Sequence, residues 1–500
     1  MLTPEYIAGL ADDILGLYNE LEAAIMRDIV RRLLKTGEVT DTAHWQINKA
    51  QEAGLLYEDV IRQVVKISEK SDAEIERLFA EAGVKALQFD TGIYRAAGLN
   101  PLPLNLSSAA SRVLLAGIKK TQGLLNNLTR TTANTSQQAY IHAAAIAELQ
   151  ITSGAFDPAT AIRNAIREAV KTGPFVSYPS GHKDRVDVAV TRAVRTGVSQ
   201  TTGEISLQYA DDMGCDLMEI TAHFGARPSH AVWQGQIVSL SGRAGYLSRD
   251  DIGYGSGDGF KGWNCRHDWY PYFEGISRPA YTAQRLREYA DKTVQYNGQD
   301  MSYYDATQRQ REMERRIRAT RRELAGYDEA LKAAAPEQRK AVQPDFDKAA
   351  VRLKSQEAAY KDFAAQTGLT ARANRLFTPE FNRSVSQKAV KANAAFTKLI
   401  DQPIIKTDKQ FGKKIGKHAS DFGLNPRNAE DRKRMESIID GIVSNRTEVR
   451  LGQWRGQPNA VLFYIKDADV VLVSKNREFI TILKGGVENG RVKNARKLKV

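Results

Sequence analysis

Cysteine is scarce in this chain, which has two cysteines among 500 residues. Cys215 and Cys265 are too few to build a disulfide framework. Their number instead indicates synthesis in a reducing cytoplasm, where folding depends on a buried apolar core rather than on cross-links. A chain of this length is too long for one core, so we expect several domains.

Long apolar runs are also absent. No stretch of about 18 consecutive apolar residues occurs, so the sequence predicts no membrane span. The N-terminal segment MLTPEYIAGLADDILGLYNE is acidic and amphipathic. It lacks the basic segment and the apolar run of a secretory signal, and none is expected.

Positive charge, by contrast, is in excess. The chain has 72 Lys and Arg against 59 Asp and Glu, a net charge of +13. Residues 401–500 hold 21 basic and 12 acidic residues, and so supply +9 of this total. Such a bias indicates contact with nucleic acid or an acidic partner surface, although a solvated basic face has the same composition.

Apolar periodicity predicts a multidomain fold that is mostly α-helical in its N-terminal and middle regions. In residues 1–170, apolar residues recur every three or four positions, as on the buried face of an amphipathic helix. Residues 171–277 change character, because a long helix is followed by a β-like run at 217–222 and a loop rich in glycine and aromatic residues. This stretch predicts a small α+β module.

Residues 215–271 of the α+β module hold both cysteines and three of the seven histidines. His230, Cys265 and His267 are three residues of the types that bind zinc. No CxxC or HxxxH pair anchors such a site, so we assign no metal and expect hydrogen-bonded or core residues. A metal protein or cytoplasmic enzyme built on this set is the third alternative for the chain. Nothing in WNCRHDWY indicates the activated thiolate of a cysteine protease.

Residues 278–370 are highly charged and predict a helical hairpin or a coiled-coil arm that turns near Pro336 and Pro344. Residues 371–405 show no sustained pattern and are interpreted as a linker. The apolar seam of the arm consists of Met313, Ile317, Leu324 and Leu331.

Residues 406–500 predict a second α+β domain. The segment AEDRKRMESIIDGIVSN has the spacing of a helix, with Asn425 or Asn428 as its cap. TEVRLG, AVLFYIK, DVVLVSK and EFITILK are typical of strands joined by short turns. We expect one helix packed on a four-stranded antiparallel sheet.

A single histidine, His418, lies in the basic segment GKKIGKHASDF of this domain. Imidazole suits acid or base work near neutral pH, and this set of residue types fits metal-independent RNA cleavage by the 2′-hydroxyl. No carboxylate cluster indicates a two-metal nuclease. An exposed histidine and an ordinary strand threonine are the simpler alternative. The candidate catalytic residues are His418, Lys417, Arg455, Thr481 and Lys484, and the candidate substrate-binding residues are Trp454 and Tyr464.

Two stretches in the middle of the chain resemble a known family. VDVAVTRAVRTGVSQTTGEISLQYADDMGCDLMEITAHFGARPSHAVWQGQ and GYGSGDGFKGWNCRHDWYPY resemble the minor capsid proteins of tailed bacteriophages and prophages, of the minor capsid protein 2 type, which are similar in role to Mu-type head morphogenesis proteins. The resemblance covers about residues 1–280. It implies a virion protein in the capsid interior near the portal, made in the bacterial host cytoplasm. It implies portal and major capsid proteins as partners, contact with phage DNA, no membrane, and no chemistry for His230 or Cys265.

The C-terminal domain resembles the toxin domains of the barnase–EndoU–colicin–RelE-like ribonuclease superfamily, through GKHASDF, GQWRGQ and FITILK. The resemblance implies a ribonuclease without a cofactor, with RNA as substrate and an immunity protein as a partner to test for. It implies a histidine acid/base, a basic residue and a late Ser or Thr, here His418, Arg455 or Lys484, and Thr481, with Lys417 or Tyr464 as the complement. The alternative is a purely structural protein whose basic C-terminal domain only binds nucleic acid.

Overall fold

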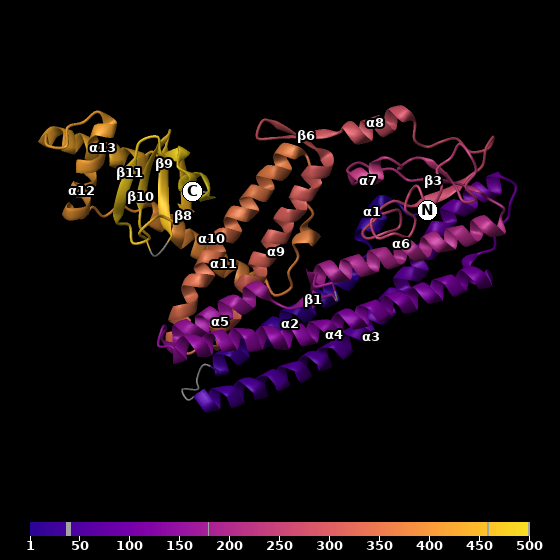
Figure 1. Ribbon diagram of the computed structural model, residues 1–500, viewed down its shortest axis with the longest axis horizontal. Coiled ribbons are helices and arrows are strands. Elements are labelled where there is room, and N and C mark those ends of the chain that lie inside the picture. The colour runs from indigo at the N-terminus through magenta and orange to yellow at the C-terminus, as the bar shows by residue number, and fades with distance from the viewer. Residues whose placement is uncertain (37–41, 179, 458–459, 499–500) are drawn as a thin grey trace. The chain divides into compact units, whose positions relative to one another are not determined.

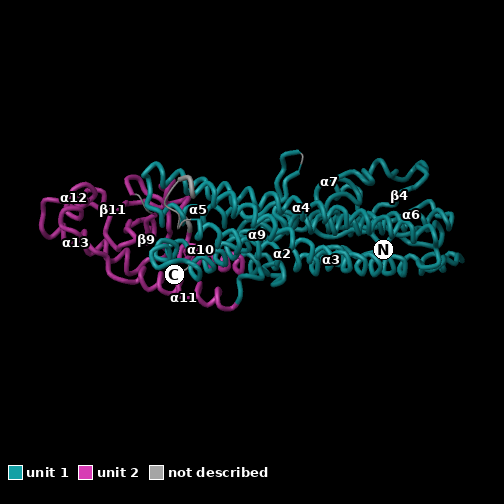
Figure 2. Tube along the Cα trace, turned by 90° about the horizontal axis from the view of Figure 1, so that it is seen from below, with its two compact units in different colours: residues 1–345, 363–382 teal, residues 346–362, 383–500 magenta. Residues whose placement is uncertain are grey.

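The computed structural model describes residues 1–36, 42–178, 180–457 and 460–498 (Figure 1). The chain divides into two compact units, coloured separately in Figure 2. The helical unit comprises residues 1–345 and 363–382, and the C-terminal unit comprises residues 346–362 and 383–500. Among the described residues, every helix is too short or too polar to span a bilayer.

Long helices form the body of the helical unit, as the periodicity predicts. Two of these helices have a side-chain N-cap. Ser107 accepts a hydrogen bond from the Ala110 N–H at the start of one, and Asp157 accepts one from the Thr160 N–H at the start of the other. In Figure 1 the long helices run alongside one another, with α4 packed against α3, α5 and α6. The helices are α1 (Pro4–Gly9), α2 (Asp12–Thr36), α3 (Thr42–Ala96), α4 (Ser108–Thr152), α5 (Pro158–Thr172) and α6 (Val186–Asp212).

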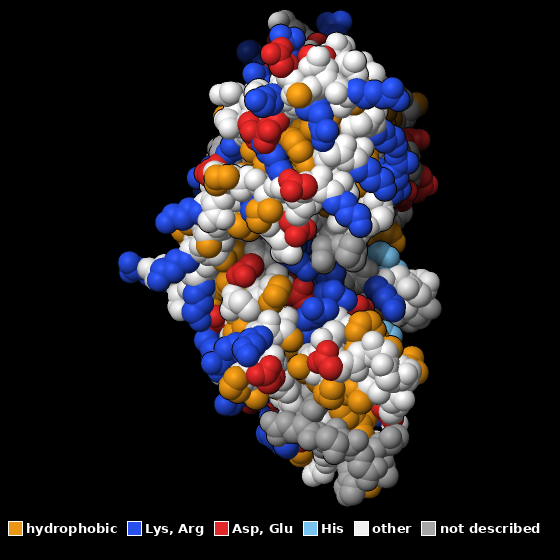
Figure 3. Space-filling view, turned by 90° about the vertical axis from the view of Figure 1, so that its left-hand side faces the viewer, with side chains coloured by type: hydrophobic (Ala, Val, Ile, Leu, Met, Phe, Trp, Pro, Cys, Tyr) orange, Lys and Arg blue, Asp and Glu red, His pale blue; other side chains and the backbone are white. Residues whose placement is uncertain are grey.

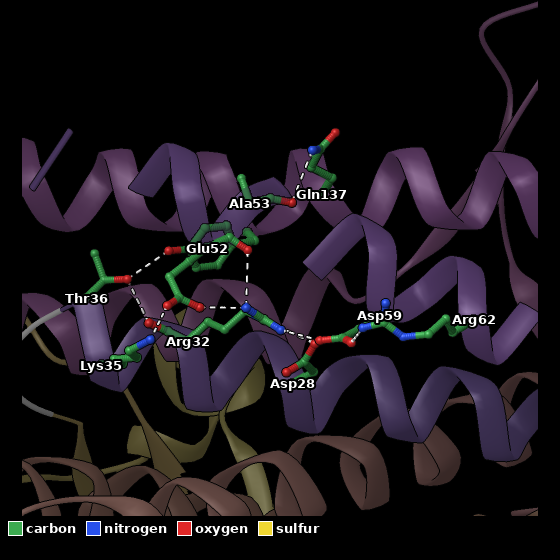
Figure 4. A network of polar contacts seen from close by, with 10 residues as sticks. Asp28, Arg32, Lys35, Thr36, Glu52, Ala53, Asp59, Arg62 and Gln137 are labelled. Atoms are coloured by element: carbon green, nitrogen blue, oxygen red, sulfur yellow. Dashed lines mark hydrogen bonds and ion pairs between the residues drawn. The ribbon is translucent and has the colours of Figure 1, made fainter. Parts of the chain in front are cut away.

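A polar network joins α2, α3 and α4 (Figure 4). The Arg32 guanidinium of α2 donates hydrogen bonds to Glu52 and Asp59 of α3. The Thr36 hydroxyl of α2 lies 2.7 Å from the Tyr140 hydroxyl of α4. Lys35 of α2 also pairs with Glu52, so two cations neutralise this carboxylate, which is only 5% exposed. These contacts favour one register of the three helices.

The α+β module forms as predicted. Strand β3 (Leu217–Ile220) is the centre of a three-stranded antiparallel sheet with β4 (Ile237–Ser239) and β5 (Trp269–Tyr272). The predicted β-like run 217–222 thus contains β3, and the loop rich in glycine precedes β5. The buried side chains of Met218, Phe260 and Trp269 pack in one cluster with Ile205 of α6. A short helix, α7 (Pro228–Ala231), and the hairpin of β1 (Phe175–Ser177) and β2 (Lys183–Arg185) complete this region.

The charged region forms a helix pair preceded by elements that the sequence did not indicate. These are α8 (Ala283–Asp291), β6 (Thr293–Tyr296) and β7 (Gln299–Ser302), and the pair is α9 (Tyr303–Ala333) and α10 (Pro336–Thr367). Pro336 is the first residue of α10, as a turn proline should be, whereas Pro344 lies inside the helix.

Helix α9 is not a free arm, because it packs against α2 and α5. Arg322 of α9 lies 3.3 Å from Glu22 and 3.1 Å from Asp187, and both acidic residues are buried. The seam residues Ile317 and Leu324 are fully buried, but the helical spacing puts them on the face of α9 opposite Arg322. The face that docks α9 onto the N-terminal helices therefore carries Arg322 and Gly326 and is not the predicted seam.

The C-terminal unit is a five-stranded antiparallel sheet with helices, in the order β11-β10-β9-β8-β12. It has one strand more than expected, because residues 496–498 add an edge strand to β8. Asn428 caps α13 by accepting hydrogen bonds from the N–H groups of Glu430 and Asp431. The elements are α12 (Asp408–His418), α13 (Ala429–Ser444), β8 (Glu448–Gly452), β9 (Val461–Lys466), β10 (Asp469–Val473), β11 (Phe479–Leu483) and β12 (Arg496–Leu498).

Two segments before residue 406 belong to this unit. The interpretation of 371–405 as a linker is wrong for Arg383–Asp401, which forms helix α11. Ile400 of α11 and Val351 of α10 are buried in the same cluster as the sheet residue Leu462. The Ser355 hydroxyl also donates a 2.9 Å hydrogen bond to the Lys497 carbonyl. The middle of α10 is therefore part of the C-terminal core.

Candidate functional site

His418 ends helix α12 and has a carboxylate partner. Its Nδ1 lies 3.0 Å from Asp421 Oδ2, and its side chain is 14% exposed. The pair forms because the short helical turn 419–422 places Asp421 beside the end of α12. Engagement of Nδ1 leaves Nε2 for proton transfer. Asp421 was not among the residues predicted from the sequence, although its i+3 spacing from His418 is a signal for such a pair.

Basic side chains gather around α12. Burial lowers the pKa of Lys414, and the charges of Lys417, Lys413 and Arg455 lower it further. This mutual repulsion indicates a locally positive surface. In Figure 3, blue Lys and Arg side chains form a group at the upper right of the face, and others lie at its left edge and in its lower half.

Lys484 directly follows strand β11 and approaches the same region. Its Nζ lies 5.0 Å from the ring centre of Phe422, four residues beyond His418. The structure therefore brings His418 and Lys484 to one end of α12.

Thr481 lies on the other face of the sheet. It pairs across the strands with Leu472, and side chains of directly opposed residues share a face. Leu472 packs in the cluster of Val461 and Phe463, whereas Ile415 of α12 packs in the opposite cluster. Thr481 is 3% exposed, and its Oγ1 has no hydrogen-bond partner among the described residues. This position does not place its hydroxyl beside His418.

The two aromatic candidates for base stacking are buried and lie in different clusters. Trp454 is 8% exposed and packs edge-on against Phe463. Tyr464 is fully buried on the helix-covered face, where its hydroxyl donates to the Ile400 carbonyl at 2.9 Å. The expectation that Tyr464 stacks on a base is wrong for this conformation, because core packing covers its ring.

A second cluster lies in the helical unit, where His230, Cys265 and His267 converge. The Nδ1 atoms of the two histidines are 3.4 Å apart, and Cys265 Sγ lies 3.8 Å from the His230 Nδ1 and 3.7 Å from the His267 Nδ1. Helix α7 carries His230, and the segment leading into β5 carries the other two. Each of the three residues is at most 2% exposed.

Hydrogen bonds determine which ring nitrogen of each histidine in this cluster carries the proton. His230 Nε2 lies 2.8 Å from the Asp258 carbonyl, which only accepts, so Nε2 carries the proton. His267 Nε2 lies 3.3 Å from Gln234 Oε1, an oxygen that also accepts from the His223 N–H. Both Nδ1 atoms are therefore unprotonated in the neutral rings and present lone pairs to each other.

Burial keeps these rings neutral. Desolvation lowers the pKa of His230 to about 4 and the pKa of His267 well below its usual value. Desolvation also lowers the pKa of His223 to about 4, and its ring stacks on His267 with centroids 4.5 Å apart. Burial raises the pKa of the Cys265 thiol. Two neutral imidazoles and a thiol thus meet in a buried site.

The cluster borders a cleft of about 500 Å³ within the helical unit, whose lining includes all three residues. Seven arginines and three acidic residues line the same cleft. Burial lowers the pKa of Arg195 and Arg266 to about 10, and the neighbouring Arg311 and Arg375 contribute. This repulsion between guanidinium groups indicates a positive cleft that suits an anionic ligand.

The His418 site and the His/Cys cluster differ in whether they lie within a match to a known family. The family model described as phage minor capsid protein 2 matches residues 2–365, which include the His/Cys cluster but not His418. A structural protein of Lactococcus phage LL-H is 26% identical over 305 residues, or 58% of this chain and 79% of that protein. No solved structure shows significant similarity. Because the family match spans well over half of the chain, this protein belongs to the phage minor capsid protein 2 family.

Proposed function

We propose that this phage structural protein carries a metal-independent ribonuclease in its C-terminal unit. The observation that supports the proposal is the pairing of His418 Nδ1 with Asp421 at 3.0 Å on a basic helix end. A carboxylate orients the imidazole and stabilises its protonated form, which leaves Nε2 to exchange a proton with substrate. The family assignment supports a place in the virion, and we propose the capsid interior near the portal.

The proposed reaction is attack of the RNA 2′-hydroxyl on the adjacent phosphorus. His418 Nε2 takes the 2′ proton while the O2′–P bond forms, and the P–O5′ bond then breaks. Lys417 gives a proton to the departing O5′, since Tyr464 is buried. Arg455 and Lys484 offset the charge of the pentavalent phosphorane. The products are a 2′,3′-cyclic phosphate and a 5′-hydroxyl end.

A second function, nucleic-acid binding without cleavage, is favoured by charge alone. Residues 401–500 have 21 basic and 12 acidic residues, and phosphate contacts of this kind need no histidine. Such binding should weaken steeply with salt and be indifferent to the loss of His418.

The test uses the full chain, incubated with total RNA in EDTA as wild type and as His418→Ala. His182→Ala is the matched control, because His182 is also partly exposed and pairs with a carboxylate, Asp184, at 3.1 Å. We expect wild type and His182→Ala to produce cyclic phosphate ends and His418→Ala to lose at least about 100-fold in rate. Intact RNA with folded wild-type protein would refute the ribonuclease and leave nucleic-acid binding.

The proposed location is tested separately. We propose that the portal and major capsid proteins are partners of the helical unit, with phage DNA nearby and an immunity protein for the C-terminal unit in the producing cell. Cross-linking of purified particles followed by mass spectrometry should recover peptides of the portal joined to residues 1–345. Absence of the protein from purified particles would contradict a place in the virion.

A further inference from the structure

The three donor atoms of the His/Cys cluster have the spacing of a tetrahedral metal site. In such a site, Zn–N bonds of about 2.0–2.1 Å and Zn–S bonds of about 2.3 Å give N–N edges of about 3.4 Å and N–S edges of about 3.6 Å. The measured separations are 3.4 Å between the nitrogens and 3.7 and 3.8 Å to the sulfur. A single ion placed between the three atoms would meet all of them at bonding distance.

The tautomers of the two histidine rings also favour a cation between their Nδ1 atoms. Nδ1 of His230 and Nδ1 of His267 face each other as acceptors, because each ring commits its proton to a carbonyl oxygen through Nε2. The Cys265 thiol has one proton and cannot bridge two lone pairs at once. Buried acceptors at 3.4 Å repel unless a cation lies between them.

The residues around the donors also match a metal centre. Histidine ligands of metals almost always donate the other ring N–H to a carbonyl or carboxylate, which orients the ring. Asp258 supplies that acceptor through its backbone carbonyl at 2.8 Å, and Gln234 supplies it at 3.3 Å. Gln234 is held in turn by the His223 N–H at 3.1 Å.

We propose that His230 Nδ1, His267 Nδ1 and Cys265 Sγ bind a zinc ion whose fourth position opens to the arginine-lined cleft. Two imidazoles and a thiolate favour zinc over hard cations such as magnesium or calcium. Three protein ligands and a cleft lined by Arg227 and Arg266 leave the fourth position to water or to a small anion. The site lies in the helical unit and is independent of the proposed ribonuclease.

The first test measures metal in the full chain, purified without chelator from zinc-supplemented cells and then desalted. We expect about one zinc per chain in the wild type and less than about one tenth of that in Cys265→Ser and His230→Gln. Cys215→Ser is the matched control, because Cys215 is also buried but contacts the Leu217 carbonyl at 3.3 Å. Zinc-free wild type, copper in place of zinc, or equal loss in Cys215→Ser would overturn the assignment.

A second measurement keeps the test valid if the variants fail to fold. Chelator-treated wild-type protein is titrated with cobalt(II), which adopts the coordination of zinc and absorbs visibly. One equivalent should produce a sulfur-to-cobalt charge-transfer band and tetrahedral d–d bands. Addition of azide or inorganic phosphate should shift the d–d bands if the fourth position is open. A cobalt spectrum without the sulfur band refutes the Cys265 ligand, and d–d bands unmoved by either anion refute the open position.

Discussion

The His418 site and the His/Cys cluster differ in what surrounds the imidazole. His418 is on a basic helix end, is partly exposed and has one carboxylate partner. His230 and His267 are buried, and each ring has its proton fixed by a carbonyl oxygen. An exposed ring can exchange protons with a substrate, whereas a buried ring of fixed tautomer is an oriented ligand. The same residue type thus suits proton transfer in one unit and metal binding in the other.

The two sites also differ in whether they lie within the residues that the family model matches. The buried cluster lies within the matched residues 2–365, and His418 lies outside them. We therefore expect a metal centre to be part of the capsid role and the C-terminal unit to be an addition with its own activity. Disturbing one unit should leave the function of the other in place.

The largest effect is expected from Lys261→Met. Lys261 is 1% exposed, adopts a left-handed φ of 61° and pairs with the buried carboxylate of Asp268, next to His267. Its loss removes the ion-pair partner of the buried Asp268 carboxylate, which should cost about 3–5 kcal/mol in the free energy of unfolding. Calorimetry should show an earlier transition of the helical unit and loss of bound metal.

The matched control for this prediction is Lys340→Met. Lys340 forms an exposed ion pair with Glu337 at 3.3 Å, which should contribute less than about 1 kcal/mol. RNA cleavage by Lys261→Met should persist at temperatures where the C-terminal unit stays folded. Equal melting temperatures of the two variants would contradict the buried ion pair as a source of stability.

Acid should destabilise the helical unit through Asp187. Burial alone would raise the pKa of this carboxyl, but Arg322, Arg318 and Arg185 hold it well below its usual range. The unfolded state therefore binds the proton more readily. The stabilising contribution is present above the unfolded pKa of about 4 and is lost as the pH falls towards the folded pKa. Denaturant titrations between pH 6 and about pH 3 should show this loss, and Asp187→Asn should flatten it.

A smaller effect is expected from Asp421→Asn in the C-terminal unit. The amide no longer stabilises a protonated His418, so the rate of RNA cleavage should fall about tenfold while RNA binding is retained. Asp467→Asn, an exposed change in the β9–β10 turn, is the control and should leave the rate unchanged. A normal rate in Asp421→Asn would remove the carboxylate from the proposed mechanism.

The smallest effect is expected from Thr481→Val. Within the part of the chain that the structure describes, the buried Oγ1 of Thr481 has no hydrogen-bond partner. Replacing the hydroxyl with a methyl group should therefore raise the free energy of unfolding by up to about 1 kcal/mol. Cleavage should continue at the wild-type rate because the side chain lies on the other face of the sheet. A large loss of activity would restore Thr481 to the candidate site.

The sequence predicted local features more reliably than long-range ones. The strands β9, β10 and β11, the Asn428 cap and the long helices follow from patterns within a few residues. Helix α11 was missed although Val385, Ala389, Phe396 and Ile400 have helical spacing, because many small and polar residues separate them. Edge strand β12 was missed because its basic residues look like a solvated tail.

The candidate sites also depend on long-range contacts, which the sequence did not predict. The convergence of His230 with His267 depends on a loop that brings residues 37 apart in sequence to 3.4 Å, and no short motif encodes it. The burial of Tyr464 and the facing of Thr481 depend on which side of the sheet α12 covers. Strand alternation predicts that the two residues lie in a sheet, but it does not predict which face of the sheet is covered by helices.

Helix α10 starts in the helical unit, and its middle part contributes Val351 and Ser355 to the core of the C-terminal unit. The chain passes between the units three times, at 345/346 and 362/363 inside the continuous helix α10 and again at 382/383. A protease that cuts only within 368–382 would produce two fragments that stay associated through α10. Exchange of the C-terminal unit between phages would likewise need a crossover point upstream of residue 346, so that the new unit brings its own segment of the helix.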